Sequence, residues 1–483
     1  MTASLRLLTT WVAVFGLFLT TSAQEALPTD YLPATFHKGR REAARQLMPD
    51  GSVMAVFAAP VRNYANDVDY NYHQNPDLYY FTGYKEPNAV LLLFKEEQTG
   101  TDGQKFNEIF FVQKRNEQME RWNGRRLGVE GVKTKLGIAN ALNGEDFKAF
   151  DFNGVQFSKI LLFPLAEDVA DNRRGAADLY DLIKQFKEKA GITTATNEKV
   201  DHRLYRQVTG QLREIKTDEE MDLIRKAVEI SCQGQNEVMK AVHANMSELE
   251  IQGLHEYVHK KYGAESVGYG SIVGAGENGC ILHYTENTKT KVGTEMLLMD
   301  VGAEYHGYTA DVTRTIPVDG KFSNEEKAIY NIVYNAQEAA FKILKDGAKM
   351  SDASNAARNV IADGLLKLGL IKEAKDVGRY YPHGLMHHIG LDVHDRSASN
   401  VFKKGMVMTV EPGIYIPENS PVDKKWWGIA VRIEDDVLIT QNGYELLSHF
   451  APRSVEAIEK IMSQKSALDD FKLPPLQSGK KAF

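Results

Sequence analysis

The stretch "HGLMHHIGLDVHD" places four histidines and two aspartates within residues 383–395. Imidazole is the commonest nitrogen ligand of metal ions, and it exchanges protons near neutral pH. His383 and His387 are four residues apart, a spacing that predicts that both lie on one face of a helix. The glutamate of the H-E-x-x-H zinc motif is missing, so the partners for a metal ion must come from elsewhere in the chain. For His388 we prefer a structural role.

Two aspartates lie on a predicted β-hairpin, "EMLLMDVGAEYHGYTADVTRTIPV". A tight turn at His306-Gly307, where glycine can take positive φ, would make Gly302 face Asp311. Asp300 and Asp311 would then project from the same face of the sheet as diagonal neighbours. Carboxylates that close repel each other unless a proton or a cation compensates them. Alternatively, one aspartate caps a turn and the other faces solvent.

Two further carboxylates lie in apolar strands. Glu411 ends the strand of "GMVMTVEPGIYIP" before a Pro-Gly turn, and "GIAVRIEDDVLIT" places Glu434 in a strand. Period-two alternation puts Arg432 on the same face as Glu434. Charged groups in such strands are costly unless they are paired or bind a metal. Carboxylates combined with imidazole from residues 383–395 would form an oxygen-rich set of ligands that favours Mn²⁺, although Co²⁺ or Zn²⁺ could substitute in vitro.

The elements that must position these residues fall into two groups. Apolar runs bounded by glycine, proline or asparagine predict buried strands up to about residue 175: "GSVMAVFAAP", "NAVLLLF", "NEIFFVQ" and "KILLFP". Residues 176–260 look helical, with capping-box spacing at Thr217/Glu220 and at Ser247/Glu250. Another helical block covers about 324–370, and strands return from about residue 405.

Composition limits the classes of function. A chain of 483 residues with 43% hydrophobic and 25% charged residues predicts a folded protein of two domains. A net charge of −7 provides no basic surface for nucleic acid. The apolar start, closing with Thr21, Ser22 and Ala23, predicts a signal peptide over residues 1–23 and hence export to the periplasm, the cell surface or the medium. Cys232 and Cys280 either form a disulfide or remain two structural thiols.

Taken together, these motifs resemble the pita-bread metallopeptidases, and most closely aminopeptidase P, the Xaa-Pro aminopeptidases. The resemblance rests on "ILHYTEN", "LLMDVG", "TADVTRT", "HGLMHHIGLDVHD", "TVEPGIYI" and "VRIEDD" in that order, and on "NYHQNPDLYYFTGYKEPNAVLLL" and "ERWNGRRLG" before them. It implies an α/β N-terminal domain followed by an α+β pita-bread catalytic domain. The expected boundaries are 35–175 for the N-terminal domain, 176–215 for a helical connection, 216–463 for the catalytic domain and 464–483 for a C-terminal extension.

The resemblance also implies two metal ions. Asp311 and Glu434 would bridge them, Asp300 would complete one ion, and His387 with Glu411 would complete the other. Two ions that share a water lower its pKa. Glu411 is the family's candidate for passing a proton to the departing proline nitrogen.

Other residues match positions around the family's substrate. His283 and His394 are expected to stabilise the tetrahedral intermediate or carry protons, and His383 to contact the substrate carbonyl. Arg432 is expected either to orient the carboxylates and substrate or to form a structural salt bridge. Tyr415 is expected either to form a pocket wall or to be an ordinary core tyrosine. Trp122 matches a family tryptophan and is expected either to reach a neighbouring subunit's active site, consistent with a homo-oligomer (a dimer or tetramer), or to pack within its own domain.

The expected activity is removal of the first residue from peptides with proline second. An alternative with the same fold is a prolidase, which hydrolyses only Xaa-Pro dipeptides. The N-terminal half favours the aminopeptidase. A non-catalytic binding protein and a metal-free amidinohydrolase of the creatinase type are disfavoured, because all five metal ligands are present.

Overall fold

The computed structural model describes residues 29–100, 103–166, 175–192, 197–469 and 473. The predicted signal peptide lies outside the described residues, as does most of the predicted C-terminal extension.

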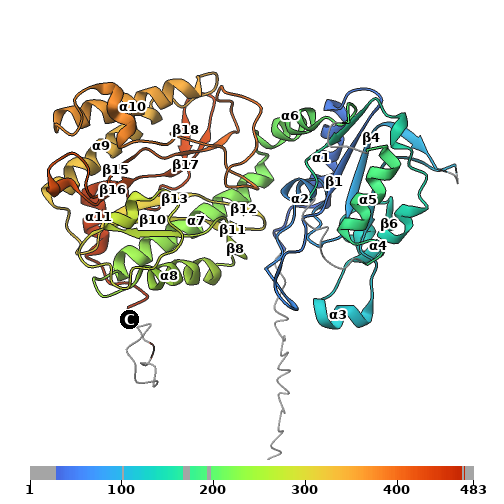
Figure 1. Ribbon diagram of the computed structural model, residues 1–483, viewed down its shortest axis with the longest axis horizontal. Helices are drawn as coiled ribbons and strands as arrows, with labels where there is room; N and C mark the ends of the chain where they lie inside the picture. Colours follow the sequence, from blue (N-terminus) through green and yellow to red (C-terminus); the bar gives the residue numbers. More distant parts are fainter. Residues whose placement is uncertain (1–28, 101–102, 167–174, 193–196, 470–472, 474–483) are drawn as a thin grey trace, which may run out of the picture. The chain divides into compact units, whose positions relative to one another are not determined.

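The N-terminal half is built on a five-stranded mixed sheet in the order β6-β5-β4-β1-β7 (Figure 1). Strands β1, β4 and β5 are antiparallel neighbours, whereas β7 and β6 join the edges in parallel. All four predicted strands are confirmed, and every residue of β1 is buried. The elements are α1 (Ala34–Leu47), β1 (Ser52–Phe57), β2 (Asn63–Ala65), β3 (Val68–Asp69), α2 (Pro76–Thr82), β4 (Val90–Thr99), β5 (Lys105–Val112), α3 (Glu117–Asn123), α4 (Gly128–Lys135), β6 (Ala141–Asn143), β7 (Lys159–Leu162) and α5 (Leu179–Ala190).

Three helices follow: α6 (His202–Arg213), α7 (Asp218–Ala241) and α8 (Glu248–Lys261). The two predicted capping signals mark the starts of α7 and α8. Helix α7 begins with a complete capping box, in which Thr217 and Glu220 each accept a backbone N–H from the other. Helix α8 begins where Ser247 Oγ accepts the Glu250 N–H at 3.0 Å. These bonds satisfy amide groups that a helix start leaves without partners.

The C-terminal half consists of short antiparallel strands between two helical layers. Figure 1 shows α9 and α10 on one side of these strands and α7 and α8 on the other. The predicted helical block is confirmed as α9 and α10. The elements are β8 (Ser266–Val267), β9 (Ile272–Ala275), β10 (Met296–Val301), β11 (Ala303–Tyr305), β12 (Tyr308–Thr309), β13 (Val312–Pro317), α9 (Asn324–Phe341), α10 (Met350–Lys367), β14 (Val407–Val410), β15 (Gly413–Ile416), β16 (Ile429–Arg432), β17 (Asp435–Ile439), β18 (Tyr444–Leu446) and α11 (Val455–Met462).

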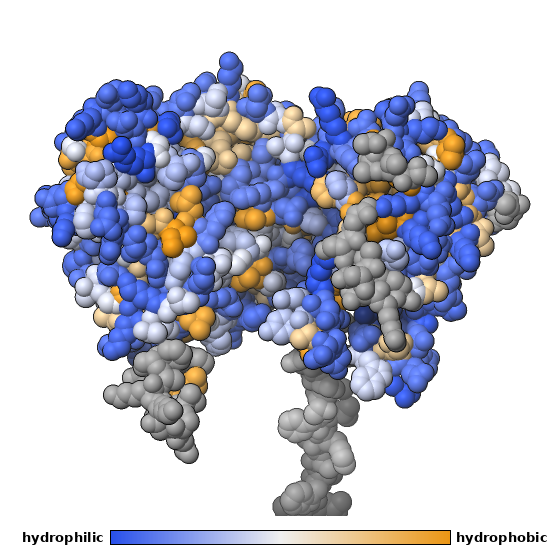
Figure 2. Space-filling model, in the orientation of Figure 1, coloured by the Kyte–Doolittle hydropathy of each residue, from blue (hydrophilic) through white to orange (hydrophobic). Residues whose placement is uncertain are grey.

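The visible surface is mostly hydrophilic, with hydrophobic side chains in small separate patches (Figure 2). Within the described ranges, none of the helices is both long and apolar enough to cross a bilayer. Cys232 and Cys280 are free thiols, so the structure supports two structural cysteines over a disulfide.

Candidate metal centre

The β10–β13 hairpin places Asp300 and Asp311 on one face. Asp300 pairs with Thr313 where β10 pairs with β13, and β11 and β12 at the tip of the hairpin keep the same register. The turn residues His306 and Gly307 have φ of 51° and 87°, as a two-residue turn with two left-handed positions requires. The predicted hairpin and its register are therefore confirmed.

Tyr269 joins the two aspartates, and sequence reasoning missed it. Its hydroxyl lies 2.6 Å from Asp300 Oδ1 and 2.6 Å from Asp311 Oδ1. The residue lies in a loop between β8 and β9, where neither a capping signal nor a clear alternation marks it. Since a phenol carries one hydrogen, it can donate to only one of these oxygens at a time.

His387 and Glu411 come from two chain segments that run side by side. The Thr409 N–H donates to His387 O at 2.9 Å, and the Glu411 N–H donates to Leu385 O at 2.8 Å. Residues 383–388 are therefore extended alongside β14, and the predicted helical face for His383 and His387 is wrong. Main-chain pairing with β14 takes the place of helical hydrogen bonds. Both side chains nevertheless reach the same cavity.

Glu434 lies in the break between β16 and β17 and not within a strand, which corrects the sequence prediction. Its carboxylate accepts a hydrogen bond from Thr313 Oγ1 at 2.6 Å, and its N–H donates to Thr313 O at 3.1 Å. Arg432 and Glu434 still face the same cavity, as the alternation predicts.

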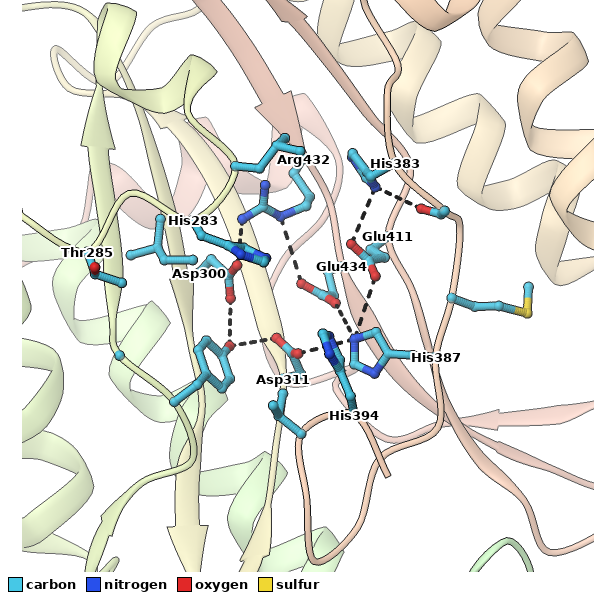
Figure 3. A pocket seen from close by; sticks show the side chains of 17 residues that line it. His283, Thr285, Asp300, Asp311, His383, His387, His394, Glu411, Arg432 and Glu434 are labelled. Carbon is cyan, nitrogen blue, oxygen red and sulfur yellow. Dashed lines mark hydrogen bonds and ion pairs between the residues drawn. The ribbon is translucent and has the colours of Figure 1, made fainter. Parts of the chain in front are cut away.

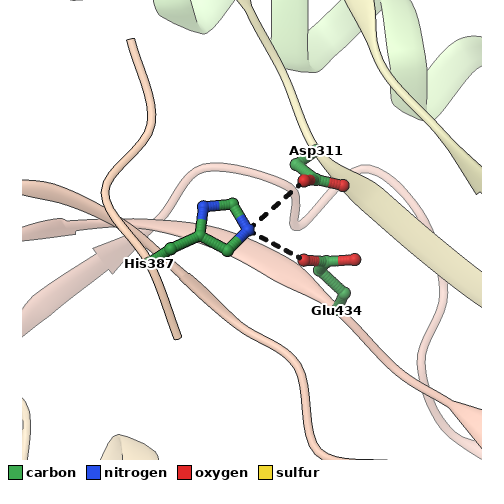
Figure 4. A group of neighbouring side chains, drawn as sticks. All are labelled: Asp311, His387 and Glu434. Carbon is green, nitrogen blue, oxygen red and sulfur yellow. Dashed lines mark ion pairs between the residues drawn. The ribbon is translucent and has the colours of Figure 1, made fainter. Parts of the chain in front are cut away.

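These segments converge around the His387 ring (Figures 3 and 4). Its Nε2 lies 3.6 Å from Asp311 Oδ2, 3.6 Å from Glu411 Oε1 and 4.0 Å from Glu434 Oε1. One ligand atom each from Asp311, His387 and Glu434 lies within 4.8 Å of the others. Such spacing suits ligands that surround a cation about 2 Å from each of them.

Burial makes this cluster electrostatically unfavourable without added positive charge. Burial and the neighbouring Asp300 carboxylate raise the pKa of Glu434 to about 7. Burial and then Glu434 raise the pKa values of Asp311 and Glu411 well above their usual range. Burial also lowers the pKa of His387 to about 4, which leaves its ring neutral and able to bind a metal. Four carboxylates and a neutral imidazole thus fit divalent cations.

Arg432 supplies one positive charge to the site. Its guanidinium donates to Asp300 Oδ2 at 2.5 Å and to the Tyr415 hydroxyl at 2.9 Å. Arg432 therefore both forms a salt bridge and orients a carboxylate. Tyr415 is buried outside the residues that line the cavity, and its hydroxyl also lies 2.8 Å from His383 Nε2.

The three remaining histidines also line the cavity, which has a volume of about 480 Å³. The His394 ring lies 4.3 Å from that of His387, and His383 Nδ1 lies 3.6 Å from Glu411 Oε2. Burial and then Arg432 lower the pKa of His383 to about 4. His283 faces the same space (Figure 3). Apolar lining comes from Ile272, Leu282, Met386 and Val393.

A buried ion-pair network holds the segment that carries His394. The Arg213 guanidinium donates to Asp77 of α2 at 2.8 Å, to Asp392 at 2.8 Å and to Asp395 at 2.5 Å. Lys216 donates to the other oxygen of Asp395 at 2.6 Å. This network fixes both sides of His394 and ties them to the N-terminal half.

Comparison with known proteins supports the same interpretation. Residues 222–441 match metallopeptidase family M24, and residues 37–153 match the aminopeptidase P N-terminal domain. The Xaa-Pro aminopeptidase of Escherichia coli strain K12 is 36% identical over 441 residues, which cover 88% of this chain and 96% of that protein. That of Haemophilus influenzae is 34% identical over 446 residues, covering 89% and 97%. The solved structure of Pseudomonas aeruginosa aminopeptidase PepP aligns with a TM-score of 0.79 and 33% identity, covering 89% of this chain and 98% of that one. The chain therefore belongs to the aminopeptidase P family, with the pita-bread catalytic domain of the M24 metallopeptidases.

Proposed function

We propose that this metallopeptidase is an Xaa-Pro aminopeptidase, which hydrolyses the bond between an N-terminal residue and a penultimate proline. The observation that carries the proposal is the convergence of four carboxylates, three of them buried and that of Glu411 half-buried, and one neutral imidazole on one cavity. The named relatives that match most of the chain favour this activity over a prolidase.

Family M24 implies divalent metal ions, and the donor set fits them. The proposed ligands of two ions are Asp300, Asp311, His387, Glu411 and Glu434. Hard oxygen donors with one imidazole favour Mn²⁺. When bound, such ions polarise the scissile carbonyl and lower the pKa of water.

Glu411 is the proposed proton carrier. Its Oε1 lies 3.6 Å from His387 Nε2 and its Oε2 lies 3.6 Å from His383 Nδ1, and Glu411 lines the cavity. Burial and then the Glu434 carboxylate raise its pKa, which favours the protonated form more than in an ordinary glutamate. It can therefore take up a proton and deliver it to the departing proline nitrogen.

The remaining cavity residues are proposed to hold the peptide. His383 would contact the substrate carbonyl, and His283 and His394 would stabilise charge or carry protons. Apolar groups such as Leu282 and Val393 suit the proline ring. Because an Xaa-Pro bond has no N–H and proline fixes φ, a dedicated cavity can select it by shape.

The first test compares three peptides on protein that has been stripped of metal and reloaded with Mn²⁺. An Xaa-Pro-Xaa tripeptide should lose its first residue, while a matched Xaa-Ala-Xaa tripeptide and the Xaa-Pro dipeptide should be cleaved far more slowly. Glu411→Gln should lower kcat by roughly a hundredfold or more. Cleavage of the dipeptide alone would show a prolidase, and equal cleavage of both tripeptides would contradict selection for proline.

Three further predictions remain proposals: export, oligomerisation and the domain boundaries. Residues 1–23 are proposed as a cleaved signal peptide, so the mature protein should start at Gln24 and be absent from the cytoplasmic fraction.

Trp122, which is 83% exposed, is proposed to contact a neighbouring subunit in a homo-oligomer. Trp122→Ala should reduce the mass measured by analytical ultracentrifugation. Limited proteolysis, with the masses of the fragments measured, tests the predicted domain boundaries.

A further inference from the structure

Two histidines on α8 lie outside the set that lines the catalytic cavity. His255 and His259 are one helical turn apart, with their ring centroids 6.3 Å from each other. They are only 0% and 1% exposed. Among the residues that the structure describes, His255 Nδ1 and both ring nitrogens of His259 have no hydrogen-bond partner. Buried polar atoms are almost always paired, so three such nitrogens in one place require an explanation.

Met299 sets the orientation of the first ring. Its Sδ lies 3.4 Å from His255 Nε2, within reach of a weak N–H···S hydrogen bond. A proton on Nε2 leaves the lone pair on Nδ1. Ligand histidines are commonly prepared in this way, because a bond at one nitrogen fixes the other as the donor to a metal.

Two of these nitrogens, His255 Nδ1 and His259 Nε2, lie beside Gly234 of α7. A Cβ atom at this glycine would lie 3.0 Å from His259 Nε2 and 3.3 Å from His255 Nδ1. The missing side chain therefore leaves a small space that both nitrogens approach. Burial lowers the pKa of His259 to about 4 and that of His255 well below its usual value, so both rings are neutral at pH 7.

We propose that His255 and His259 bind one soft monovalent cation, Cu⁺, in the space beside Gly234. Imidazole is a good copper ligand, and Cu⁺ is satisfied by few donors. A structural Zn²⁺ would require four ligands and would bring two charges into a site of neutral side chains. The bound ion would give His255 Nδ1 and His259 Nε2 a partner and link α8 to α7 behind the strand that carries Asp300. This site is independent of the proposed peptidase activity.

The experiment titrates full-length protein, preloaded with Mn²⁺, with Cu⁺ under anaerobic conditions against the chelator bicinchoninate. Long incubation allows the buried site to open. Gly234→Ala places a methyl group in the space and should still fold, because alanine is the better helix former. The matched control is Gly253→Ala on α8, where a Cβ would meet nothing within 4 Å.

Wild type and Gly253→Ala should each retain one more Cu⁺ per chain than Gly234→Ala. They should also show a larger rise in Tm with Cu⁺. His259→Phe keeps a ring but removes both nitrogens, so it should also bind one Cu⁺ per chain less than wild type. This variant tests the proposal if Gly234→Ala does not fold. Copper bound by Cys232, Cys280 or the catalytic centre is common to all four proteins. Equal copper content in all of them, or none in wild type, would overturn the proposal.

Discussion

At the scale of single residues, one hydroxyl shows why the catalytic cluster needs a cation. Tyr269 lies 2.6 Å from an oxygen of Asp300 and 2.6 Å from an oxygen of Asp311. Because the hydroxyl has a single hydrogen to donate, it can supply a proton to only one of these two short O···O contacts. A cation bound by the two carboxylates would compensate their charge, so that Tyr269 would need to donate to only one of them.

Tyr269→Phe removes both hydrogen bonds and keeps the ring. We expect the affinity for Mn²⁺ to fall about tenfold to a hundredfold, as is typical when a residue that orients metal ligands is lost. The measurement is Mn²⁺ titration followed by kcat at saturating metal. Tyr262→Phe, on an exposed tyrosine, is the control. An unchanged metal affinity would contradict a role for Tyr269 in holding the aspartates.

The pKa of Glu434 predicts an unusual pH dependence for the metal-free protein. A folded-state pKa of about 7, above the unfolded value, means that the folded protein binds the extra proton. The stabilisation that this proton gives the folded state is complete below the unfolded pKa and is lost as the pH rises through 7. The glutamine of Glu434→Gln does not titrate. The difference in the free energy of unfolding between the variant and wild type should therefore shift in the variant's favour by roughly 3 kcal/mol between pH 4.5 and 8.

Urea unfolding in the presence of a chelator tests this difference. The buried histidines, whose pKa values are lowered, contribute in the opposite direction in both proteins. Asp311 and Glu411 lose in the variant the part of their raised pKa values that comes from Glu434, which adds to the variant's relative stability as the pH rises. Added Mn²⁺ should reverse the order, because the ion replaces the proton on wild type and not on the variant. A difference that stays constant with pH would refute the assignment.

At the scale of elements, the segment that carries His394 depends on the end of α6. Arg213→Met keeps a long side chain but leaves Asp77, Asp392 and Asp395 short of a cation. Breaking a buried ion pair costs about 3–5 kcal/mol. We expect that loss of stability, together with a lower kcat and an unchanged Mn²⁺ affinity, because the hydrogen bonds of Arg213 go to the neighbours of His394 and not to the proposed metal ligands.

Urea unfolding, kcat and metal titration measure the three effects separately. Arg225→Met is the control, since Arg225 forms an exposed pair with Glu445 and should cost less than 1 kcal/mol. A variant that is destabilised but keeps its full kcat would show that the network is structural only.

Elements with strong local signals were predictable from the sequence. The His306-Gly307 turn fixed the register of Asp300 and Asp311, and the capping box of Thr217 fixed the start of α7. The helix predicted over His383 and His387 failed because a four-residue spacing also fits an extended segment that pairs with a distant strand. Tyr269 could not be predicted, since its role depends on a contact between a loop and the hairpin 31 residues away.

At the scale of the whole molecule, the two halves share a hydrophobic core. One cluster of buried side chains includes Leu91 and Phe110 from the N-terminal sheet, Ile224 from α7 and Tyr308 from β12. The Tyr80 hydroxyl of α2 also donates to Leu212 O at 2.9 Å. Separating the halves would expose this core and break the network around Arg213. Their stabilities are therefore coupled, although the domain boundaries themselves remain a prediction.

We accordingly expect residues 32–469 to unfold in one cooperative transition. In calorimetry of the metal-free protein, the measured enthalpy should equal the van't Hoff enthalpy, even though chains of this length often unfold domain by domain. Residues 216–483 expressed alone should aggregate or melt without cooperativity, because the apolar face of α7 loses its partners from the N-terminal sheet. Two well-separated transitions, or a stable isolated catalytic half, would show that the shared core contributes little to stability.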